Sequence, residues 1–408
     1  MKLKCTPADF EVEEKANLRP TGGPFGLYRL TKTSLGTPEA IDAILQKWNL
    51  ARWQVAYAGL KDKHALTRQY LTIKAGPRQG MRQTNVELEY LGQTSEPIHA
   101  KDIRANAFTV VMRDMQPPEV ASAATAMDQI GQFGLPNYFD DQRFGSLGQS
   151  GDFIAKPWCL GDYERALWLA MAEVNVHDTP EEREQKDILR KFWGRWPECK
   201  AALSRSHRRS VITFLADKPD RPDFKRALAL IRQDWRSIYL AAFQSDLWNG
   251  MLSALLRKVC PAGSLICRKI GKRDLPFYAA LDDGAKATLR DTLLPLPSAR
   301  QHLDEGPIKQ LVDEVLAAEG MELRQMRLKF PRDTFFSKGE RPAIFFPAGV
   351  SHDVGEDDFY RGKQKMTLRF ELPRGAYATI LVKRVTGANL EAEEPESEPA
   401  PQTASPVD

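Results

Sequence analysis

Apolar and polar positions change their spacing twice along this chain, and the changes divide it into three parts. Strand-like apolar runs occur early, at 86–91 and 107–112, and again late, at 365–372 and 377–384. From about 160 to about 260 the spacing is mostly helical. This order predicts one α+β domain that is interrupted by an insertion.

Two helices can be placed from their ends. Residues 37–39 (Thr-Pro-Glu) have the composition of a helix start, with Thr37 as the cap. Residues 120–133 predict a second helix, rich in small residues, that ends at Gly134. Residues 134–139 are predicted to be a loop, because Gly, Pro and Asn cluster there.

Length and composition narrow the class of protein. The 408 residues, 42% of them apolar, suffice for two or three domains with a substantial core. No apolar run is long enough to span a bilayer, and the first residues are not an apolar signal segment. The five Cys are dispersed and form no CxxC pair, which argues against a disulfide framework or a structural zinc site. We therefore expect a cytoplasmic protein.

The charge is unevenly distributed. The net charge is +4, but residues 387–408 contain six acidic residues and no Lys or Arg, so the rest of the chain carries +10. Such a body attracts polyanions, of which nucleic acid is the commonest, although Lys and Arg that merely solvate a surface explain the count equally well. The composition of 387–408, rich in Pro, Glu, Ser and Ala, predicts a disordered acidic tail.

The most informative segment is Ala58–Gln69, which follows a short apolar run. Its carboxylate, Asp62, stands between Lys61 and Lys63, and Gly59 permits a tight turn before it. A carboxylate between cations stays ionised and can act as a base or nucleophile, while the same cations can hold a phosphate. For an isolated Lys-Asp-Lys an exposed charged turn is the better interpretation. The length of the whole pattern favours a site.

A second segment, Gly134–Gly145, combines aromatic, amide and Arg side chains within a loop bounded by Gly. Aromatic faces and amides suit single-stranded RNA, in which bases are stacked and their edges are read. The simpler alternative is that the aromatic residues pack the loop onto the core, and both can hold. Further along, 236–249 has helical core spacing, so that Gln244 and Asn249 are its plausible site groups.

A basic stretch with two Trp residues, 190–209, is either an RNA-backbone patch or a solvated helix face. Motifs for bound metals and cofactors are absent: the six His form neither HxxxH nor HExxH, and there is no GxxxxGK[ST] or GxGxxG after a strand. We therefore expect neither a metal nor a cofactor.

Taken together, these motifs resemble the tRNA pseudouridine synthase D (TruD) family. Residues 3–10 with Glu14 are similar to its N-terminal K-x-x-P-x-D-F…E signature, and 58–69 to its AGxKDxxAxTxQ segment. Further matches are the NxF strand at 106–108, the GxPNYFGxQRFG loop at 134–145, the aromatic-Asn helix end at 245–249 and the closing strand at 377–384. One position departs from the pattern, since Asp140 stands where the family usually has Gly.

The resemblance implies a fold, a reaction and an RNA partner. The fold is an α+β pseudouridine-synthase catalytic domain with a mixed, mainly antiparallel sheet, interrupted by an α/β insertion domain. The corresponding ranges are 1–152 and 323–386 for the catalytic domain and 153–322 for the insertion. The reaction converts a uridine of RNA, most typically uridine 13 of tRNA, to pseudouridine without a cofactor. We expect a monomer that binds tRNA and neither metal nor membrane.

The resemblance also implies roles for single residues. Asp62 is the catalytic carboxylate, which attacks C1′ of the sugar or C6 of the base, or removes the C2′ proton; the sequence does not choose among these routes. Phe139 stacks on a flipped-out uracil, and Asn137 positions Asp62 or the base. The remaining candidates hold phosphate, support the Asp62 charge or contact substrate: Lys4, Lys61, Gln69, Arg143 and Asn249.

Two other functions compete with this one. A non-catalytic RNA-binding or RNA-folding protein would keep the cleft without turnover, and the charge of Asp140 is the feature that favours it. A glycosidase that uses Asp62 would release free uracil or leave an abasic site. The combination of the Asp62 segment with the Asn137–Phe139 loop favours the isomerase.

Overall fold

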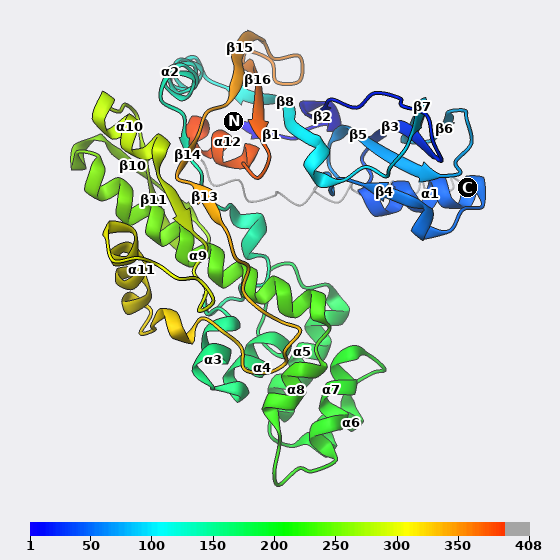
Figure 1. Ribbon diagram of the computed structural model, residues 1–408, viewed down its shortest axis with the longest axis vertical. Helices are drawn as coiled ribbons and strands as arrows, with labels where there is room; N and C mark the ends of the chain where they lie inside the picture. Colours follow the sequence, from blue (N-terminus) through cyan, green and yellow to red (C-terminus); the bar gives the residue numbers. More distant parts are fainter. Residues whose placement is uncertain (388–408) are drawn as a thin grey trace, which may run out of the picture.

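A ten-stranded, mainly antiparallel sheet crosses one end of the molecule, and helices fill the other end (Figure 1). The computed structural model describes residues 1–387. The strand order is β15-β16-β8-β2-β5-β3-β7-β6, with β1 beside β8 and β4 beside β5. Its strands are β1 (Lys2–Leu3), β2 (Phe10–Ala16), β3 (Phe25–Thr33), β4 (Val55–Tyr57), β5 (Leu66–Lys74), β6 (Met81–Gln83), β7 (Val86–Thr94), β8 (Ile103–Met115), β15 (Ala348–Glu356) and β16 (Gln364–Pro373).

One parallel pair, β2 with β5, brings the N-terminal strand next to the strand that follows the Asp62 segment. The other ladders of this sheet are antiparallel, and β8 links the early strands to β16 from the end of the chain. The late strands predicted at 365–372 therefore complete a sheet that begins at residue 2, which confirms the α+β class and the predicted order of elements.

The β3–β7 half of the sheet has its own small core beneath one helix. Helix α1 (Thr37–Trp48) lies on this half and buries Ala40, Ile41 and Ile44 against strand residues such as Tyr28 and Leu71. Its cap is Gly36 rather than Thr37, as the sequence had suggested, because Thr37 already lies inside the first turn. Its hydroxyl is thereby free to bond elsewhere.

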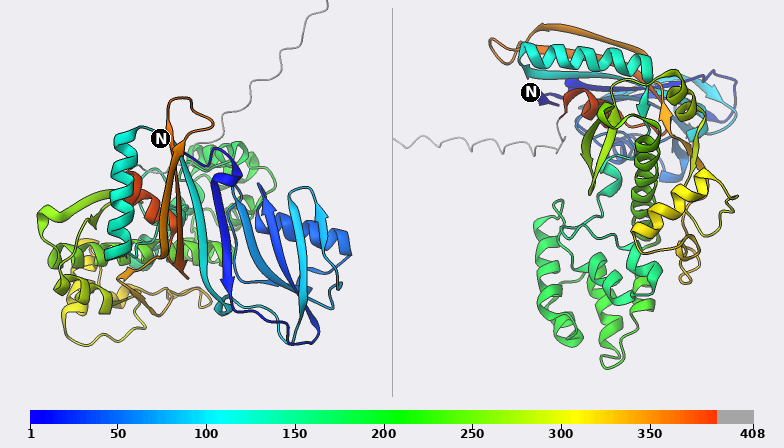
Figure 2. Two further views of the ribbon diagram at one scale, coloured as in Figure 1. Left: turned by 90° about the horizontal axis from the view of Figure 1, so that it is seen from above. Right: turned by 90° about the vertical axis from the view of Figure 1, so that its left-hand side faces the viewer.

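The opposite end of the sheet is covered by α2 (Pro117–Phe133), which packs against β15 and β16 (Figure 2). Gly134 ends α2 at φ 72°, and a Cβ there would lie 2.6 Å from the carbonyl oxygen of Phe345. Glycine is therefore required at the predicted helix end. The next two residues, β9 (Leu135–Pro136), are not loop as predicted but pair with β14 (Ile344–Phe345).

The strand predicted at 377–384 is wrong, because the chain forms a helix there, α12 (Ala378–Thr386). Residues 380–385 are all buried, and α12 packs against α2. A run such as Ile-Leu-Val has the same apolar pattern in a buried strand and in a buried helix. Strand β15 already occupies the edge position next to β16, so burial against α2 decides between the two forms.

The predicted helical middle is confirmed. Helix α9 (Gln233–Val259) is its axis, and it is buried along most of its length, as expected for a helix surrounded by other elements. The other helices of this part are α3 (Ala155–Leu160), α4 (Tyr163–Met171), α5 (Pro180–Phe192), α6 (Trp196–Ala202), α7 (His207–Ala216), α8 (Phe224–Leu230), α10 (Asp283–Asp291) and α11 (Pro307–Ala318). Short strands complete it: β10 (Leu265–Ile270), β11 (Arg273–Tyr278), β12 (Leu293–Pro295) and β13 (Glu340–Pro342).

Two further expectations come from composition. The acidic tail is predicted at 387–408, and 388–408 lie outside the described residues. All five cysteines are free in the structure.

Candidate functional site

Asp62 lies in the connection between β4 and β5, and its side chain is 35% exposed. The Lys4 ammonium is 3.7 Å from its Oδ2. Lys4 has φ 54°, and its Nζ lies 4.3 Å from the centre of the Phe10 ring. The N-terminal signature thus brings a cation next to the Asp62 carboxylate.

The backbone of this connection is fixed by a buried cation that no motif had indicated. The ammonium of Lys32, on β3, donates to the carbonyl oxygens of Leu35 at 2.6 Å and of Asp62 at 2.7 Å. Lys32 is fully buried, and this burial lowers its pKa from 10.5 to about 8. The buried Lys32 ammonium therefore fixes the position of the Asp62 backbone.

Lys61 points away from Asp62 into a polar cluster. Its Nζ pairs with Oε1 of Glu14 at 2.9 Å and donates to Oδ1 of Asn106 at 2.8 Å. Glu14 is 1% exposed, and its other oxygen accepts from the backbone N–H of Tyr70 at 2.8 Å. Glu14 and Asn106, both conspicuous in the sequence signatures, therefore hold Lys61 in place. With these partners the Lys61 ammonium supports the architecture around Asp62 more than the carboxylate itself.

Thr37 and Gln69 fasten the same connection to α1 and β5. The Thr37 hydroxyl donates to Oε1 of Gln69 at 2.9 Å and accepts from the N–H of Lys61 at 3.0 Å. Nε2 of Gln69 donates to the carbonyl oxygen of Gly59 at 3.2 Å. Gln69 is fully buried, so it acts through the backbone of the connection. Gly59 has neither a left-handed φ nor a neighbour within 4 Å of a Cβ, so nothing in its conformation requires glycine.

The second group of candidates lies where the 134–145 loop meets α9. Asn249 uses both ends of its amide on one residue: Oδ1 accepts from the N–H of Phe139 and Nδ2 donates to its carbonyl oxygen, each at 2.8 Å. Asn249 is 2% exposed. The amide thus bonds both backbone groups of Phe139, as a neighbouring strand would in a sheet. Asn249 therefore holds the loop against α9.

The Phe139 ring is packed rather than free. It is 7% exposed and lies edge-to-face with Trp248 at 5.5 Å and with Tyr377 at 6.3 Å between ring centres. The guanidinium of Arg341 lies 4.4 Å from its centre. A uracil that stacks on Phe139 therefore requires Arg341 to move from the ring, or else stacks beyond the guanidinium plane.

Arg341, on β13, is the residue here that sequence reasoning missed. Its Nε donates to the carbonyl oxygen of Asn137 at 2.8 Å and its Nη2 to Oδ1 of Asn137 at 2.5 Å. Burial lowers its pKa from 12.5 to about 10, and within residues 1–387 no carboxylate pairs with it. It stands alone in a Pro-rich stretch without any motif, so nothing in the sequence could single it out.

Asn137 and Arg143 differ in what they leave open. Asn137 is 5% exposed, and its amide is used by Arg341 and by the carbonyl oxygen of Pro342, which accepts at 3.0 Å. Arg143 is exposed; its Nε donates to Oγ of Ser245 at 3.2 Å. Asn137 is thus a structural residue of the loop in this state, while Arg143 can reach a ligand.

Asp140 fits its place without strain or uncompensated charge. Its φ is −95°, which any residue adopts, so glycine is not needed there. Its Oδ1 accepts from the fully buried ammonium of Lys383 at 2.6 Å, and Lys383 also pairs with Asp141. The charge that had favoured a non-catalytic protein is therefore balanced by a cation from α12.

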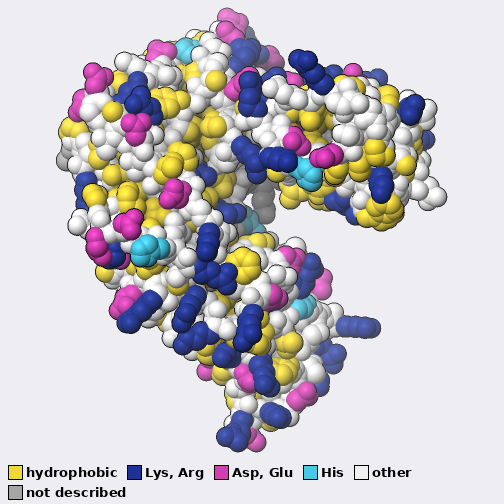
Figure 3. Space-filling view, in the orientation of Figure 1, with side chains coloured by type: hydrophobic (Ala, Val, Ile, Leu, Met, Phe, Trp, Pro, Cys, Tyr) yellow, Lys and Arg dark blue, Asp and Glu magenta, His cyan; other side chains and the backbone are white. Residues whose placement is uncertain are grey.

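The two groups of candidates lie on different parts of the fold, and no hydrogen bond, ion pair or ring contact joins them within residues 1–387. One group is built on β2, β3, β5 and β8, the other on the 134–145 loop, α9 and β13. Figure 3 shows a deep hollow between the lobe of β3–β7 with α1 and the helical part, with Lys and Arg side chains on both of its sides. Such a basic hollow suits a polyanion.

Residues 1–387 contain no group of three His, Cys, Asp or Glu side chains placed to hold a metal ion. None of their helices is long and apolar enough to pass through a bilayer.

Comparisons with known proteins agree on one family. The model of the family "tRNA pseudouridine synthase D (TruD)" matches residues 1–385. A probable tRNA pseudouridine synthase D 2 of Methanocaldococcus jannaschii is 30% identical over 94% of this chain and 91% of its own length. The tRNA pseudouridine synthase D of Aquifex aeolicus is 26% identical over 94% and 98%. The crystal structure of a putative TruD from Methanosarcina mazei, 22% identical, superposes with a TM-score of 0.75 over 95% of this chain and 94% of that one.

Proposed function

Since this chain belongs to the tRNA pseudouridine synthase D family and is therefore an isomerase of uridine, we propose that it modifies uridine 13 of tRNA with Asp62 as its catalytic carboxylate. In the isomerisation the bond from N1 of uracil to C1′ breaks and a bond from C5 to C1′ forms. The proton lost from C5 is balanced by one gained at N1. Neither an oxidant nor water is consumed.

The observation that carries this proposal is the contrast between Asp62 and its surroundings. The carboxylate is 35% exposed next to one cation, whereas Lys32, Thr37 and Gln69, which hold its backbone, are fully buried. A group that must meet a substrate atom at a defined distance requires such a rigid support. The geometry supports all three routes, attack on C1′, attack on C6 and removal of the C2′ proton, because each needs one carboxylate beside a flipped-out base.

The other candidates take part in holding RNA and its base. Lys4 and the exposed Arg143 would meet phosphate oxygens, and within residues 1–387 Arg341 has donors but no carboxylate partner. We assign Phe139 to stacking on the uracil after Arg341 moves from the ring. Gln69, Asn137, Asn249 and Lys61 then position these groups through the backbone and through the polar cluster around Glu14.

The division of the chain follows from the same assignment. We place the catalytic unit at 1–152 and 323–386, which contain the strands of the ten-stranded sheet, and the insertion at 153–322, which contains α3 to α11. RNA would lie in the hollow between the two (Figure 3). The chain is proposed to act as a monomer in the cytoplasm.

The test is to map pseudouridine in bulk tRNA that has been incubated with the purified protein, by carbodiimide treatment and primer extension. The expected result is one new stop at position 13 with wild type and none with Asp62→Asn. A stop elsewhere would replace uridine 13 by another target. Free uracil or an abasic site would show a glycosidase, and unchanged tRNA with intact binding would show a protein without turnover.

A further inference from the structure

A second basic and aromatic pocket lies in the helical part, away from Asp62. It has a volume of about 480 Å³ and lies between α3 and α4 on one side and the 324–330 segment on the other. Its lining includes three aromatic side chains, Trp158, Tyr163 and Phe330. It also includes three cations and no carboxylate: Arg324, Arg327 and Lys329.

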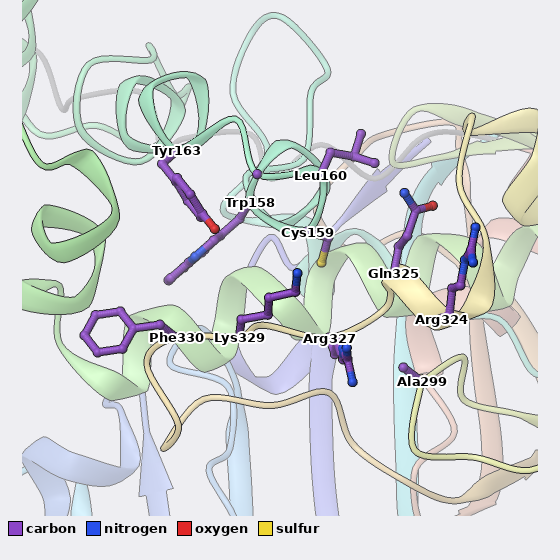
Figure 4. Close-up of a pocket in the computed structure, with 11 residues that line it drawn as sticks. Trp158, Cys159, Leu160, Tyr163, Ala299, Arg324, Gln325, Arg327, Lys329 and Phe330 are labelled. Carbon is purple, nitrogen blue, oxygen red and sulfur yellow. The ribbon is translucent and has the colours of Figure 1, made fainter.

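Two of these cations have no internal partner. Arg324 pairs with Glu322, so its charge is balanced. Arg327 and Lys329 are exposed, and within residues 1–387 neither pairs with a carboxylate. Figure 4 shows Lys329 reaching toward Trp158 and Cys159, with Tyr163 and Phe330 at one end of the pocket. Both residues belong to the lining of the pocket, where an anion would meet positive charge that no carboxylate balances within residues 1–387.

The aromatic side chains offer both a face and a donor. The Nζ of Lys225 lies 5.9 Å from the Tyr163 ring centre and 5.8 Å from that of Phe330, so a further cation stands at that end. The indole N–H of Trp158 is buried and has no acceptor within the described residues. An unmet buried donor is costly, and an oxygen of a bound molecule would satisfy it if the lining shifts on binding, because solvent does not reach this atom in the structure. Cys159 adds no reactivity, because burial raises the pKa of its thiol to about 12.

We propose that this pocket binds a nucleotide unit, with the base against the aromatic side chains and the 5′ phosphate on Arg327 and Lys329. Its volume is within the range of small-molecule sites, and stacking combined with cations is how unpaired nucleotides are held. An unpaired nucleotide of the RNA substrate and a free nucleoside monophosphate share this chemistry. The RNA source rests on the proposed function; the site itself does not.

The position of the pocket favours the RNA source. The 320–340 segment passes across α3 and α4 on the face turned to the viewer in Figure 1, and Lys and Arg side chains gather over the same region in Figure 3. A nucleotide held here would anchor the RNA at a second point, away from the base that reacts.

The experiment measures binding by the full chain and requires no turnover. Uridine 5′-monophosphate is titrated by calorimetry, and unmodified tRNA by filter binding at several salt concentrations. The double variant Arg327→Ala/Lys329→Ala is compared with Lys258→Ala/Arg290→Ala, an equal charge change on α9 and α10. We expect nucleotide binding to be weakened at least about fivefold in the first double variant and to be unchanged in the second. If RNA is the source, the salt slope of tRNA binding falls by about one, because the two cations hold one phosphate.

The outcomes separate cleanly. Loss of both ligands supports an RNA nucleotide, and loss of the monophosphate alone supports a free nucleotide. Equal binding by both double variants, or no binding of the monophosphate by wild type, overturns the proposal. Trp158→Phe, which keeps the ring and removes the N–H, should weaken nucleotide binding without unfolding the protein. All of these binding measurements can be made with the Asp62→Asn variant, which is expected to lack turnover. A failure of the pocket then appears as a loss of binding, and a failure of the proposed reaction appears only in the pseudouridine mapping.

Discussion

The Asp62 connection and the Asn137–Phe139 loop place their motif residues in opposite ways. In the first, the residue with chemistry is exposed and its neighbours are buried around it. In the second, Asn137, Phe139 and the partner Asn249 are themselves buried, while Arg143 is an exposed candidate of the same loop. A motif therefore marks positions under constraint, and the constraint is chemical in one region and mainly architectural in the other.

The difference has consequences for substitution. A change at an exposed carboxylate should affect turnover and leave stability alone, because no packing is lost. A change at a buried ring or amide should lower stability whatever it does to turnover. Measuring both quantities for variants of each region decides whether the comparison is correct.

The largest effect is expected for Asp62→Asn. The isosteric amide keeps the shape but can serve neither as a base nor as a nucleophile, so turnover should fall by at least about 100-fold. The free energy of unfolding should change by less than about 0.5 kcal/mol, since the side chain is partly exposed. Single-turnover assays and urea titrations measure the two. Asp42→Asn, an exposed position on α1 in the same lobe, is the matched control; activity within tenfold of wild type for Asp62→Asn would refute its role.

Phe139→Ala should come next, with a loss of about 3 kcal/mol in the free energy of unfolding. The ring is 7% exposed and packed by Trp248 and Tyr377, so truncation leaves a cavity. Phe335→Ala, at a ring that is 55% exposed, should cost far less. Urea unfolding compares them, and tRNA binding of the folded fraction reports on stacking. If both variants are equally stable, the packing described for Phe139 does not stabilise the fold.

Asn249→Ala removes two hydrogen bonds at once and leaves the N–H and the carbonyl of Phe139 buried without partners. We expect the unfolding free energy to fall by about 2 kcal/mol. Gln142→Ala, in the same loop but exposed, is the control and should be neutral. A neutral Asn249→Ala would mean that the amide does not hold the loop.

Arg341→Gln should raise the apparent KM for tRNA about tenfold, which corresponds to about 1.4 kcal/mol. The reason is that the guanidinium N–H groups of Arg341 are expected to meet a phosphate of the RNA. Their loss should decrease the slope of affinity against salt by about one. Arg341→Lys keeps the charge and loses the planar fork, so it should recover the salt slope but not the full affinity. If the melting temperature falls and KM and the salt slope do not change, Arg341 only supports Asn137.

The sequence could single out the Asp62 segment because its residues are close together and polar in an apolar context. What it could not predict were the partners that meet through the sheet. Lys61 with Glu14 and Asn106, or Lys383 with Asp140, are far apart in the chain and become neighbours only when β2, β8 and α12 are in place. For the same reason Asp140 looked like an uncompensated charge. Arg341 belongs to no pattern, and α12 was misread because its burial depends on α2.

The smallest effect, and the sharpest test of the support around Asp62, concerns Lys32. Burial lowers its pKa from 10.5 to about 8, so between these values the unfolded chain holds a proton that the folded chain has released. Stability contributed by this residue therefore rises with pH across that window. Relative to Lys32→Met, which cannot titrate, wild type should gain about 1 kcal/mol in unfolding free energy between pH 7 and pH 9. Lys101→Met, at an exposed lysine, should show no such gain over the same range. If the difference in unfolding free energy between wild type and Lys32→Met stays constant with pH, Lys32 titrates normally. Its bond to the Asp62 carbonyl would then not depend on a desolvated ammonium.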